Sequence, residues 1–222
     1  MIRGLINDAK LIAERDPAAK GIIEVMLLYP GFHAIFFHRI AHWFYKKQMF
    51  FIARLISQTS RFITGIEIHP GAVIGRGLFI DHGMGVVIGE TAEIGDNCTI
   101  YHGVTLGGTG KDKGKRHPTV GNNVLISTGA KVLGPFKLGD NSKIGANSVV
   151  LSEVEPNTTV VGVPGRAVKR GETRIAPSIE LDQIHNPDPV AQEMCRLLRR
   201  VEQLEKQLQE KGELLKSDES SM

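Results

Sequence analysis

The sequence of 222 residues is poor in three features that mark common classes of protein. Its two cysteines, Cys98 and Cys195, belong to no disulfide or zinc pattern, which indicates a reducing cytoplasm. Its formal net charge of +3 is small and spread along the chain, so we expect no nucleic-acid partner. Residues 25–56 are apolar but interrupted by basic side chains, and no run reaches the ~18 apolar residues that a membrane span needs. The N-terminus has no signal-peptide layout, so we expect a cytoplasmic protein that does not enter a membrane.

The dominant feature that is present is a branched aliphatic residue that returns every six positions between residues 66 and 168. The thirteen positions are Ile68, Ile74, Ile80, Ile88, Ile94, Ile100, Leu106, Val120, Ile126, Val132, Leu138, Ile144 and Val150. A small or apolar residue stands four positions after many of them, at Ala72, Ala92, Cys98, Val104, Val124, Ala130, Ser142 and Ser148. Neither the period of a helix nor that of an alternating strand fits this pattern.

A fixed period of six predicts a solenoid in which each hexapeptide forms one side of a triangular coil of about 18 residues. The aliphatic residue of each side points into the prism, and tight turns form the corners. Residues 95–97, 121–123 and 145–147 combine glycine with asparagine, which tolerate turn conformations. The pattern resembles the left-handed parallel β-helix of hexapeptide-repeat acyltransferases, so we expect this all-β solenoid over residues 65–169.

Helical segments are expected on both sides of the solenoid. Residues 1–64 are predicted to form an N-terminal helical domain that caps the open first coil. Four helices are predicted, the first with an apolar face through Leu5, Ile6, Ala9, Ile12 and Ala13 and the others at residues 22–28, 32–47 and 50–64. Residues 170–187 are predicted to be a linker, and 188–222 a C-terminal helical tail. An apolar seam with coiled-coil spacing runs along this tail through Val190, Met194, Leu197, Val201, Leu204 and Leu208, which predicts self-association.

Two interruptions of the repeat are candidates for function. One is a two-residue slip around Asp81-His82-Gly83, and the other is an insertion at residues 107–118 that must leave the prism as a loop. A regular solenoid needs neither, and functional residues often lie on loops held by a rigid scaffold. From the residues alone, His82 is either structural or a general base. Glu67 lies roughly one coil earlier, so it is either a solvated edge carboxylate or the group that fixes the tautomer of His82.

Beyond the repeat, the chain resembles the serine O-acetyltransferases of cysteine biosynthesis over about residues 16–169. The resemblance rests on Arg15-Asp-Pro-Ala18, Gly31-Phe-His-Ala34, His38-Arg-Ile-Ala-His-Trp43, Ile68-His-Pro70, Ile74-Gly-Arg-Gly77, Asp81-His82, Gly89-Glu-Thr91, Val104-Thr-Leu-Gly-Gly-Thr-Gly110, Arg116-His-Pro118 and Gly162-Val-Pro164. Hexapeptide repeats alone are shared by many acyltransferases. The Asp-His, Gly-Gly-Thr-Gly and Arg-His-Pro motifs in this order are specific.

This resemblance implies acetyl transfer from the co-substrate acetyl-CoA to the hydroxyl of L-serine, without a metal. His82 would take the proton from the serine hydroxyl and Glu67 would orient the imidazole. Family members often have aspartate at the position of Glu67, so the longer side chain is a departure that keeps the role.

The resemblance also implies how the amino acid is held. Asp16 and Asp81 would bind the ammonium of L-serine, and Arg116 and His117 its carboxylate, which a planar guanidinium can bind through two hydrogen bonds. From the residues alone, the alternatives are a helix N-cap for Asp16, a turn residue for Asp81 and a solvated loop side chain for Arg116. The residues that the resemblance assigns to acetyl-CoA are Gly107, Gly108, Thr109, Thr128, Gly129, Lys143 and Ala146.

Partners follow from the same resemblance. We expect L-cysteine to act as a feedback inhibitor, and we expect a homotrimer or a hexamer of two trimers in which His82 and the Gly108 loop of different chains meet. Family members often end in an isoleucine that enters the active site of cysteine synthase. This chain ends Asp218-Glu-Ser-Ser-Met222, so we expect weak or no binding to that enzyme.

Three alternatives remain open from the sequence. A β-helix metal enzyme would use His82, His102 and His117, although no two of these are close in sequence. A related acetyltransferase for sugars or xenobiotics would share His82 but does not need the pair Asp16 and Arg116. A non-catalytic scaffold would need neither the pairing of Glu67 with His82 nor the Gly-Gly-Thr-Gly loop.

Overall fold

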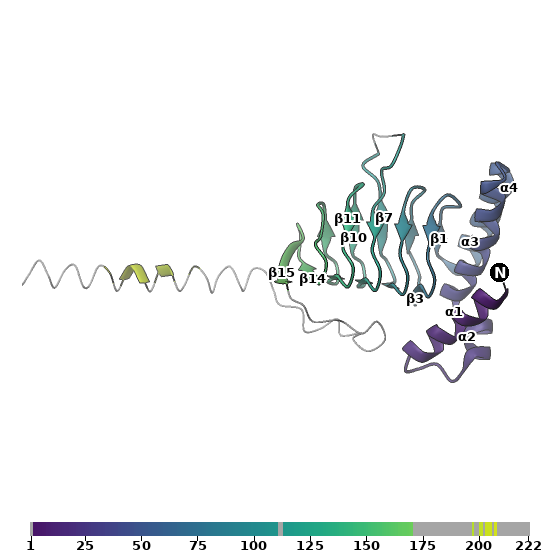
Figure 1. Cartoon of the computed structure of the whole chain (residues 1–222), viewed down its shortest axis with the longest axis horizontal. Coiled ribbons are helices and arrows are strands. Elements are labelled where there is room, and N and C mark those ends of the chain that lie inside the picture. The colour runs from purple at the N-terminus through teal and green to yellow at the C-terminus, as the bar shows by residue number, and fades with distance from the viewer. Residues whose placement is uncertain are drawn as a thin grey trace, which may run out of the picture. The chain divides into compact units, whose positions relative to one another are not determined.

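The structure, a computed structural model, describes residues 2–110, 113–170 and, in the tail, 197, 200, 201, 203–205 and 207. The chain divides into two units, Met1–Asn186 and Pro187–Met222. The first unit holds the helices and the solenoid (Figure 1). Three predictions lie outside the described residues: the linker beyond residue 170, the seam positions Val190, Met194 and Leu208, and the C-terminal end discussed for cysteine synthase.

Four helices precede the solenoid, α1(Ile2–Arg15), α2(Ile22–Leu28), α3(Pro30–Lys46) and α4(Phe50–Thr64). The predicted bounds of α2 and α4 are confirmed. Helix α3 begins two residues before the predicted start, because Pro30 fits the first turn of a helix, where its missing N–H is not needed. Helix α4 ends at Gly65, whose φ of 71° gives the left-handed cap that glycine adopts easily. Within the described residues, no helix is long and apolar enough to cross a membrane.

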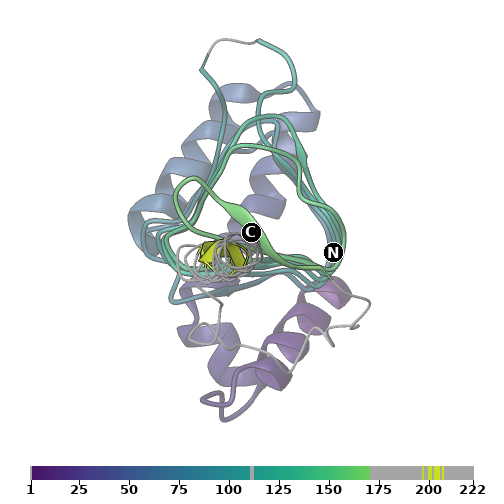
Figure 2. The same ribbon diagram turned by 90° about the vertical axis from the view of Figure 1, so that its left-hand side faces the viewer.

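The solenoid consists of short strands that form the three sides of a triangular prism, as Figure 2 shows along its axis. The strands are β1(Glu67–Ile68), β2(Val73–Ile74), β3(Phe79–Asp81), β4(Val87–Ile88), β5(Glu93–Ile94), β6(Thr99–Tyr101), β7(Thr105–Gly107), β8(Thr119–Val120), β9(Leu125–Ile126), β10(Lys131–Leu133), β11(Lys137–Leu138), β12(Lys143–Ile144), β13(Val149–Val150), β14(Thr158–Val161) and β15(Arg166–Arg170). Pairing is parallel from coil to coil, and β15 closes the last coil by pairing antiparallel with β14. The predicted left-handed parallel β-helix is confirmed.

The three sheets define faces and corners that locate the candidate site. Face A is the sheet β1-β4-β7-β10-β13, face B is β11-β8-β5-β2, and face C is β15-β14-β12-β9-β6-β3. We call the turns that lead from face C to face A the CA corner, for example between β3 and β4. The turns that lead from face A to face B form the AB corner, for example between β4 and β5. The inserted loop at residues 107–118 lies at this AB corner, between β7 and β8.

The interior of the prism follows the six-residue period. Twelve of the thirteen predicted repeat residues are buried, and Ile74 is half-buried and packs on the same core. The eight small or apolar residues predicted at the second position are buried as well. One of them is Cys98, and burial raises the pKa of its thiol to about 12, so this thiol stays protonated and unreactive.

The helices cover the first coil. Helix α4 contacts β1, and α3 contacts β1 and β3. The backbones approach closely at Gly31, where a Cβ would overlap the carbonyl oxygen of Ile80. Glycine therefore allows α3 to lie directly on β3, the strand that leads into the slip. This arrangement agrees with the prediction of a helical cap over the open end of the solenoid.

Candidate active site

The slip lengthens the turn between β3 and β4 at the CA corner. His82 has a φ of 57°, which is uncommon for a residue with a Cβ, and its side chain is 73% exposed. Its Nδ1 lies 3.9 Å from Oδ1 of Asp81, the last residue of β3. The extra residues thus hold an accessible imidazole beside a carboxylate at the edge of the prism. A positive φ at a residue other than glycine, as at His82, is often found at functional sites.

Successive coils stack their CA turns on one another. The ladder consists of the bonds from Gly103 N to Met84 O at 2.9 Å, Gly129 N to His102 O at 2.9 Å and Asn147 N to Thr128 O at 2.8 Å. Because the turns stack, the ring of His102 lies next to the ring of His82 in the preceding turn, with 5.8 Å between the ring centroids. Of the residues predicted to bind acetyl-CoA, Thr128, Gly129 and Ala146 lie further along this same corner.

Asp16 joins this corner from the helical part of the chain. It follows α1 and does not cap α2, which begins after Gly21. Its Oδ1 accepts the N–H of Ala18 at 2.8 Å and its Oδ2 accepts the hydroxyl of Tyr29 at 2.6 Å. Burial raises the pKa of Asp81, and the charge of Asp16 raises it further against the opposing effect of His82. The two carboxylates are therefore close enough to repel each other, which makes this place attractive to a cation.

Glu67 begins β1, beside the CA corner in the coil before His82. Its backbone N–H donates to Val86 O at 2.9 Å, in the turn that His82 opens. Its carboxylate lies between two arginines of α4, 3.5 Å from Arg54 and 3.3 Å from Arg61. The backbone of Glu67 thus adjoins the turn that contains His82, while its charge is balanced by α4.

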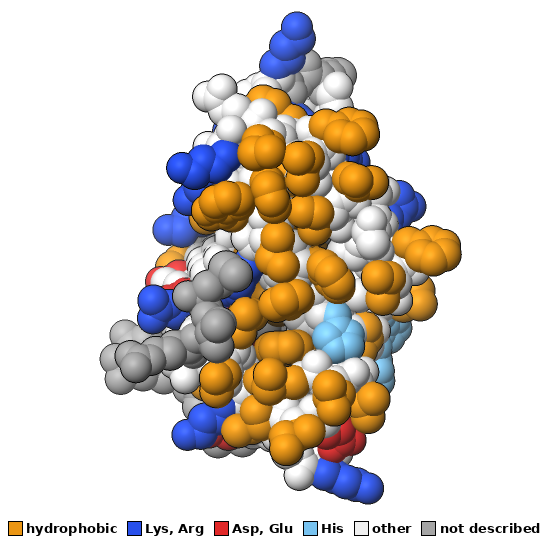
Figure 3. Space-filling view, turned by 90° about the vertical axis from the view of Figure 1, so that its right-hand side faces the viewer, with side chains coloured by type: hydrophobic (Ala, Val, Ile, Leu, Met, Phe, Trp, Pro, Cys, Tyr) orange, Lys and Arg blue, Asp and Glu red, His pale blue; other side chains and the backbone are white. Residues whose placement is uncertain are grey.

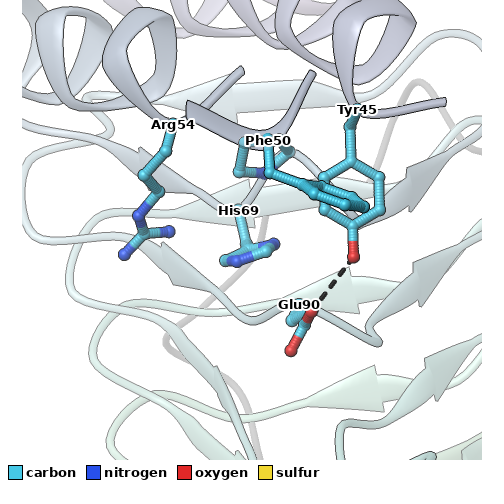
Figure 4. A pocket seen from close by; sticks show the side chains of 6 residues that line it. Tyr45, Phe50, Arg54, His69 and Glu90 are labelled. Carbon is cyan, nitrogen blue, oxygen red and sulfur yellow. Dashed lines mark hydrogen bonds between the residues drawn. The ribbon is translucent and has the colours of Figure 1, made fainter. Parts of the chain in front are cut away.

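The AB corner carries Arg116 and His117, which end the inserted loop. The guanidinium of Arg116 is paired with the carboxylate of Glu90, and this hydrogen bond lowers the pKa of Glu90. The other oxygen of Glu90 accepts the hydroxyl of Tyr45 at 3.0 Å (Figure 4). Burial lowers the pKa of His117, and the charge of Arg116 lowers it further. In the sequence, Glu90 stands out only as part of the Gly89-Glu-Thr91 motif. Its partners Tyr45 and Arg116 lie in distant segments of the chain, so no local pattern predicts the network.

A cavity of about 400 Å³ opens beside this network, between α3–α4 and the first two coils. Figure 4 shows the side chains that line it: Tyr45, Phe50, Arg54, His69, Pro70 and Glu90. Burial lowers the pKa of His69, which keeps this imidazole neutral near pH 7. Because Glu90 lines the cavity and is also paired with Arg116, the cavity adjoins the Arg116 network.

The remaining predicted residues are divided between the corners. Gly107 ends β7. Gly108 lies at the base of the inserted loop, where a Cβ would lie only 3.0 Å from the carbonyl oxygen of Arg116. Thr109 follows on this loop. Lys143 begins β12 on face C, three residues before the CA corner. Among the described residues, no group of three His, Cys, Asp or Glu side chains is arranged to hold a metal.

Within one chain the candidate residues therefore form two separate sets. His82, Asp81, Asp16 and the Thr128 turn lie at the CA corner, whereas Arg116, His117 and the glycines of the loop lie at the AB corner. The three histidines considered for a metal are divided in the same way, since His117 lies at the AB corner.

A triangular prism of parallel hexapeptide coils with an imidazole at a lengthened corner defines the class of hexapeptide-repeat transferases. Residues 117–152 match the family model described as bacterial transferase hexapeptide (six repeats). The chain is 56% identical over 209 residues to the serine acetyltransferase of Synechococcus elongatus, covering 94% of this chain and 84% of that protein. It is 54% identical over 211 residues to the serine acetyltransferase of Bacillus subtilis, covering 95% and 96%. The chain belongs to the serine acetyltransferase family.

Solved structures of relatives agree. A serine acetyltransferase from Brucella abortus in complex with coenzyme A matches with a TM-score of 0.74 at 47% identity, covering 77% of this chain and 68% of that one. A serine acetyltransferase in complex with cysteine matches with a TM-score of 0.80 at 39% identity, covering 83% and 72%. The Neisseria gonorrhoeae enzyme in complex with serine matches with a TM-score of 0.73 at 45% identity, covering 76% and 69%.

Proposed function

We propose that this chain transfers the acetyl group of acetyl-CoA to the hydroxyl of L-serine, giving O-acetyl-L-serine and coenzyme A, in the cytoplasm. This reaction is the step by which serine enters cysteine biosynthesis. The observation that carries the proposal is identity of 54–56% to serine acetyltransferases over almost the whole chain, both corners included. The relatives solved with coenzyme A and with serine support the two substrates.

His82 acts as the general base at the CA corner. Its imidazole takes the proton of the serine hydroxyl as the oxygen attacks the thioester carbon. The C–O bond forms, the C–S bond then breaks, and the imidazolium returns a proton to the leaving thiolate. Glu67 orients the imidazole from the neighbouring coil. Backbone amides of Gly107, Gly108 and Thr109 bind the pantetheine arm and are placed to stabilise the oxyanion.

The amino acid is held by charges of both signs. Asp16 and Asp81 bind its ammonium, which explains why two carboxylates are tolerated so close together. Arg116 and His117 bind its carboxylate. Thr128, Gly129 and Ala146 line the path of the cofactor along the CA corner, and Lys143 lies near its phosphates.

Two copies of the chain are needed to assemble this site. One side of a coil contains six residues, which span up to about 20 Å of extended chain. The ammonium and carboxylate of L-serine are bonded to one carbon and cannot reach two corners so far apart. We propose a homotrimer in which the CA corner of one prism faces the AB corner of its neighbour.

Two further surfaces suit self-assembly. Large apolar side chains cover the outer face of the helices (Figure 3). The most exposed are Ile23, Leu27, Leu28, Phe51 and Phe62. A surface of this kind marks an interface, and we propose that it joins two trimers into a hexamer. In the tail, Leu197, Val201 and Leu204 are helical and exposed, which supports a bundle of three parallel helices.

L-Cysteine competes with L-serine for this site. The two amino acids differ only by sulfur for oxygen, so residues that bind ammonium and carboxylate cannot exclude cysteine. The relative solved with cysteine supports this proposal. It is tested by measuring serine saturation at rising cysteine concentrations, and unchanged saturation at a large excess of cysteine would contradict it.

The central test is an acetyl-transfer assay with acetyl-CoA and a panel of hydroxyl acceptors. We expect L-serine to be strongly preferred over sugars, amino alcohols that lack the carboxylate, and hydroxy acids that lack the ammonium. Preference for a sugar would favour the related acetyltransferases, and no turnover with any acceptor would favour a scaffold.

A further inference from the structure

Thr91 contacts the end of the inserted loop through all of its polar atoms. Its carbonyl oxygen accepts Nζ of Lys115 at 2.7 Å. Its Oγ1 accepts the backbone N–H groups of Arg116 at 3.0 Å and of His117 at 3.1 Å. Its own backbone N lies 3.2 Å, and its Oγ1 2.9 Å, from Nδ1 of His117. One residue of the AB corner thus fixes both Arg116 and His117.

Counting hydrogens assigns the tautomer of His117. A hydroxyl group has one proton to donate and two lone pairs to accept with. Because two backbone N–H groups occupy the lone pairs of Thr91 Oγ1, its proton is free to point at Nδ1. The backbone N–H of Thr91 can also only donate. Nδ1 of His117 is therefore met by two donors and must be an acceptor, so the proton of the neutral ring is on Nε2.

Packing keeps the ring in this orientation and uncharged. His117 is 8% exposed, and its ring lies so close to Gly89 that a Cβ there would overlap Cδ2 and Nε2. Burial and the adjacent guanidinium both lower the pKa of His117. The imidazole is accordingly neutral at pH 7, with one N–H to offer.

We infer that Thr91 is a positioning residue that holds His117 as its Nε2–H tautomer, so that Nε2–H donates to the carboxylate of the substrate beside Arg116. The tautomer follows from the contacts alone, and its use in binding rests on the proposed function. In the other tautomer, Nε2 would present a lone pair to the carboxylate and repel it.

Two variants and one control test this role. Thr91→Val keeps the shape of the side chain but loses the hydroxyl, and Thr91→Ser keeps the hydroxyl. We expect Thr91→Val to raise KM for L-serine by up to about tenfold with a smaller change in kcat, because the hydrogen bond from His117 to the substrate carboxylate is weakened when the hydroxyl donor to Nδ1 is lost. We expect Thr91→Ser to restore KM. Thr59→Val is the control, since the hydroxyl of Thr59 bonds within α4, to Leu55 O, and KM should be unchanged.

The tautomer is measured directly by long-range ¹H–¹⁵N correlation spectra of the full-length protein labelled at histidine. We expect the Nε2–H pattern for His117 in the wild type and in Thr91→Ser. In Thr91→Val, which keeps only the longer backbone donor at 3.2 Å, we expect the Nδ1–H tautomer to gain population. An Nδ1–H pattern in the wild type overturns the inference, as does a wild-type KM in Thr91→Val. If the wild type transfers no acetyl group to L-serine, the proposed function fails while the spectra still decide the tautomer.

Discussion

At the CA corner His82 is exposed, whereas at the AB corner His117 is buried. The His82 ring lies beside Asp81 at 3.9 Å and the ring of His102, whereas Arg116 and His117 are held by hydrogen bonds to Glu90 and Thr91. The groups proposed to bind the substrate carboxylate are thus ordered within one chain. The proposed base is left accessible, as expected if a second chain completes its surroundings.

The comparison is tested most strongly at His82. We expect His82→Ala to lower kcat by about 10² to 10⁴, the usual effect of removing a general base, and to leave the fold intact because His82 lies outside the aliphatic interior. Steady-state kinetics and the thermal unfolding midpoint are the measurements. A kcat near that of the wild type would falsify the assignment of the base.

Complementation between variants tests whether the two corners belong to different chains. His82→Ala spoils the CA corner and Arg116→Ala the AB corner. In a trimer that mixes the two variants, one of the three interfaces combines an intact CA corner with an intact AB corner. Co-expression at equal levels should therefore restore about a quarter of wild-type activity from two almost inactive proteins. Sites contained within one chain would show no recovery at all.

Arg116→Lys tests the ordered network of the AB corner. Lysine keeps the charge but cannot bind Glu90 and a substrate carboxylate through a planar fork. We expect KM for L-serine to rise by roughly tenfold and kcat to change less. Arg76→Lys, at an exposed arginine elsewhere on the prism, is the matched control. If both variants behave like the wild type, Arg116 does not contact the substrate.

The residues that fill the interior of the prism can be predicted from the sequence. The side chains that contact one another between coils, or between a coil and a helix, cannot. A six-residue period states directly which residues point inward, and these residues are buried. His102 was considered only as a metal ligand because it is 20 residues from His82, although this separation is one coil plus the slip. The pairing of Glu67 with Arg54 and Arg61 depends on how α4 is rotated on the first coil, which no local pattern encodes.

The carboxylate that supports His82 is identified by comparing two variants. We expect Glu67→Gln to lower kcat by less than about tenfold, because glutamine keeps a hydrogen-bond acceptor but loses the charge. We expect Asp81→Asn to act mainly on KM for L-serine. The reverse result, with the fall in kcat in Asp81→Asn and not in Glu67→Gln, would transfer the orienting role to Asp81.

The smallest effect on chemistry is expected from the tail, which has no part in the proposed mechanism. Leu204→Ser interrupts the apolar seam, and Gln203→Ser changes the adjacent position, which is also exposed, as a control. If the seam holds three chains together, Leu204→Ser should leave kcat unchanged at high protein concentration, where the prisms associate by themselves. On dilution its activity should fall at a higher concentration than that of the wild type, in step with the mass measured by light scattering, because each site needs two chains. An activity that follows the wild type at every dilution would show that contacts between the prisms suffice to bring the two corners together.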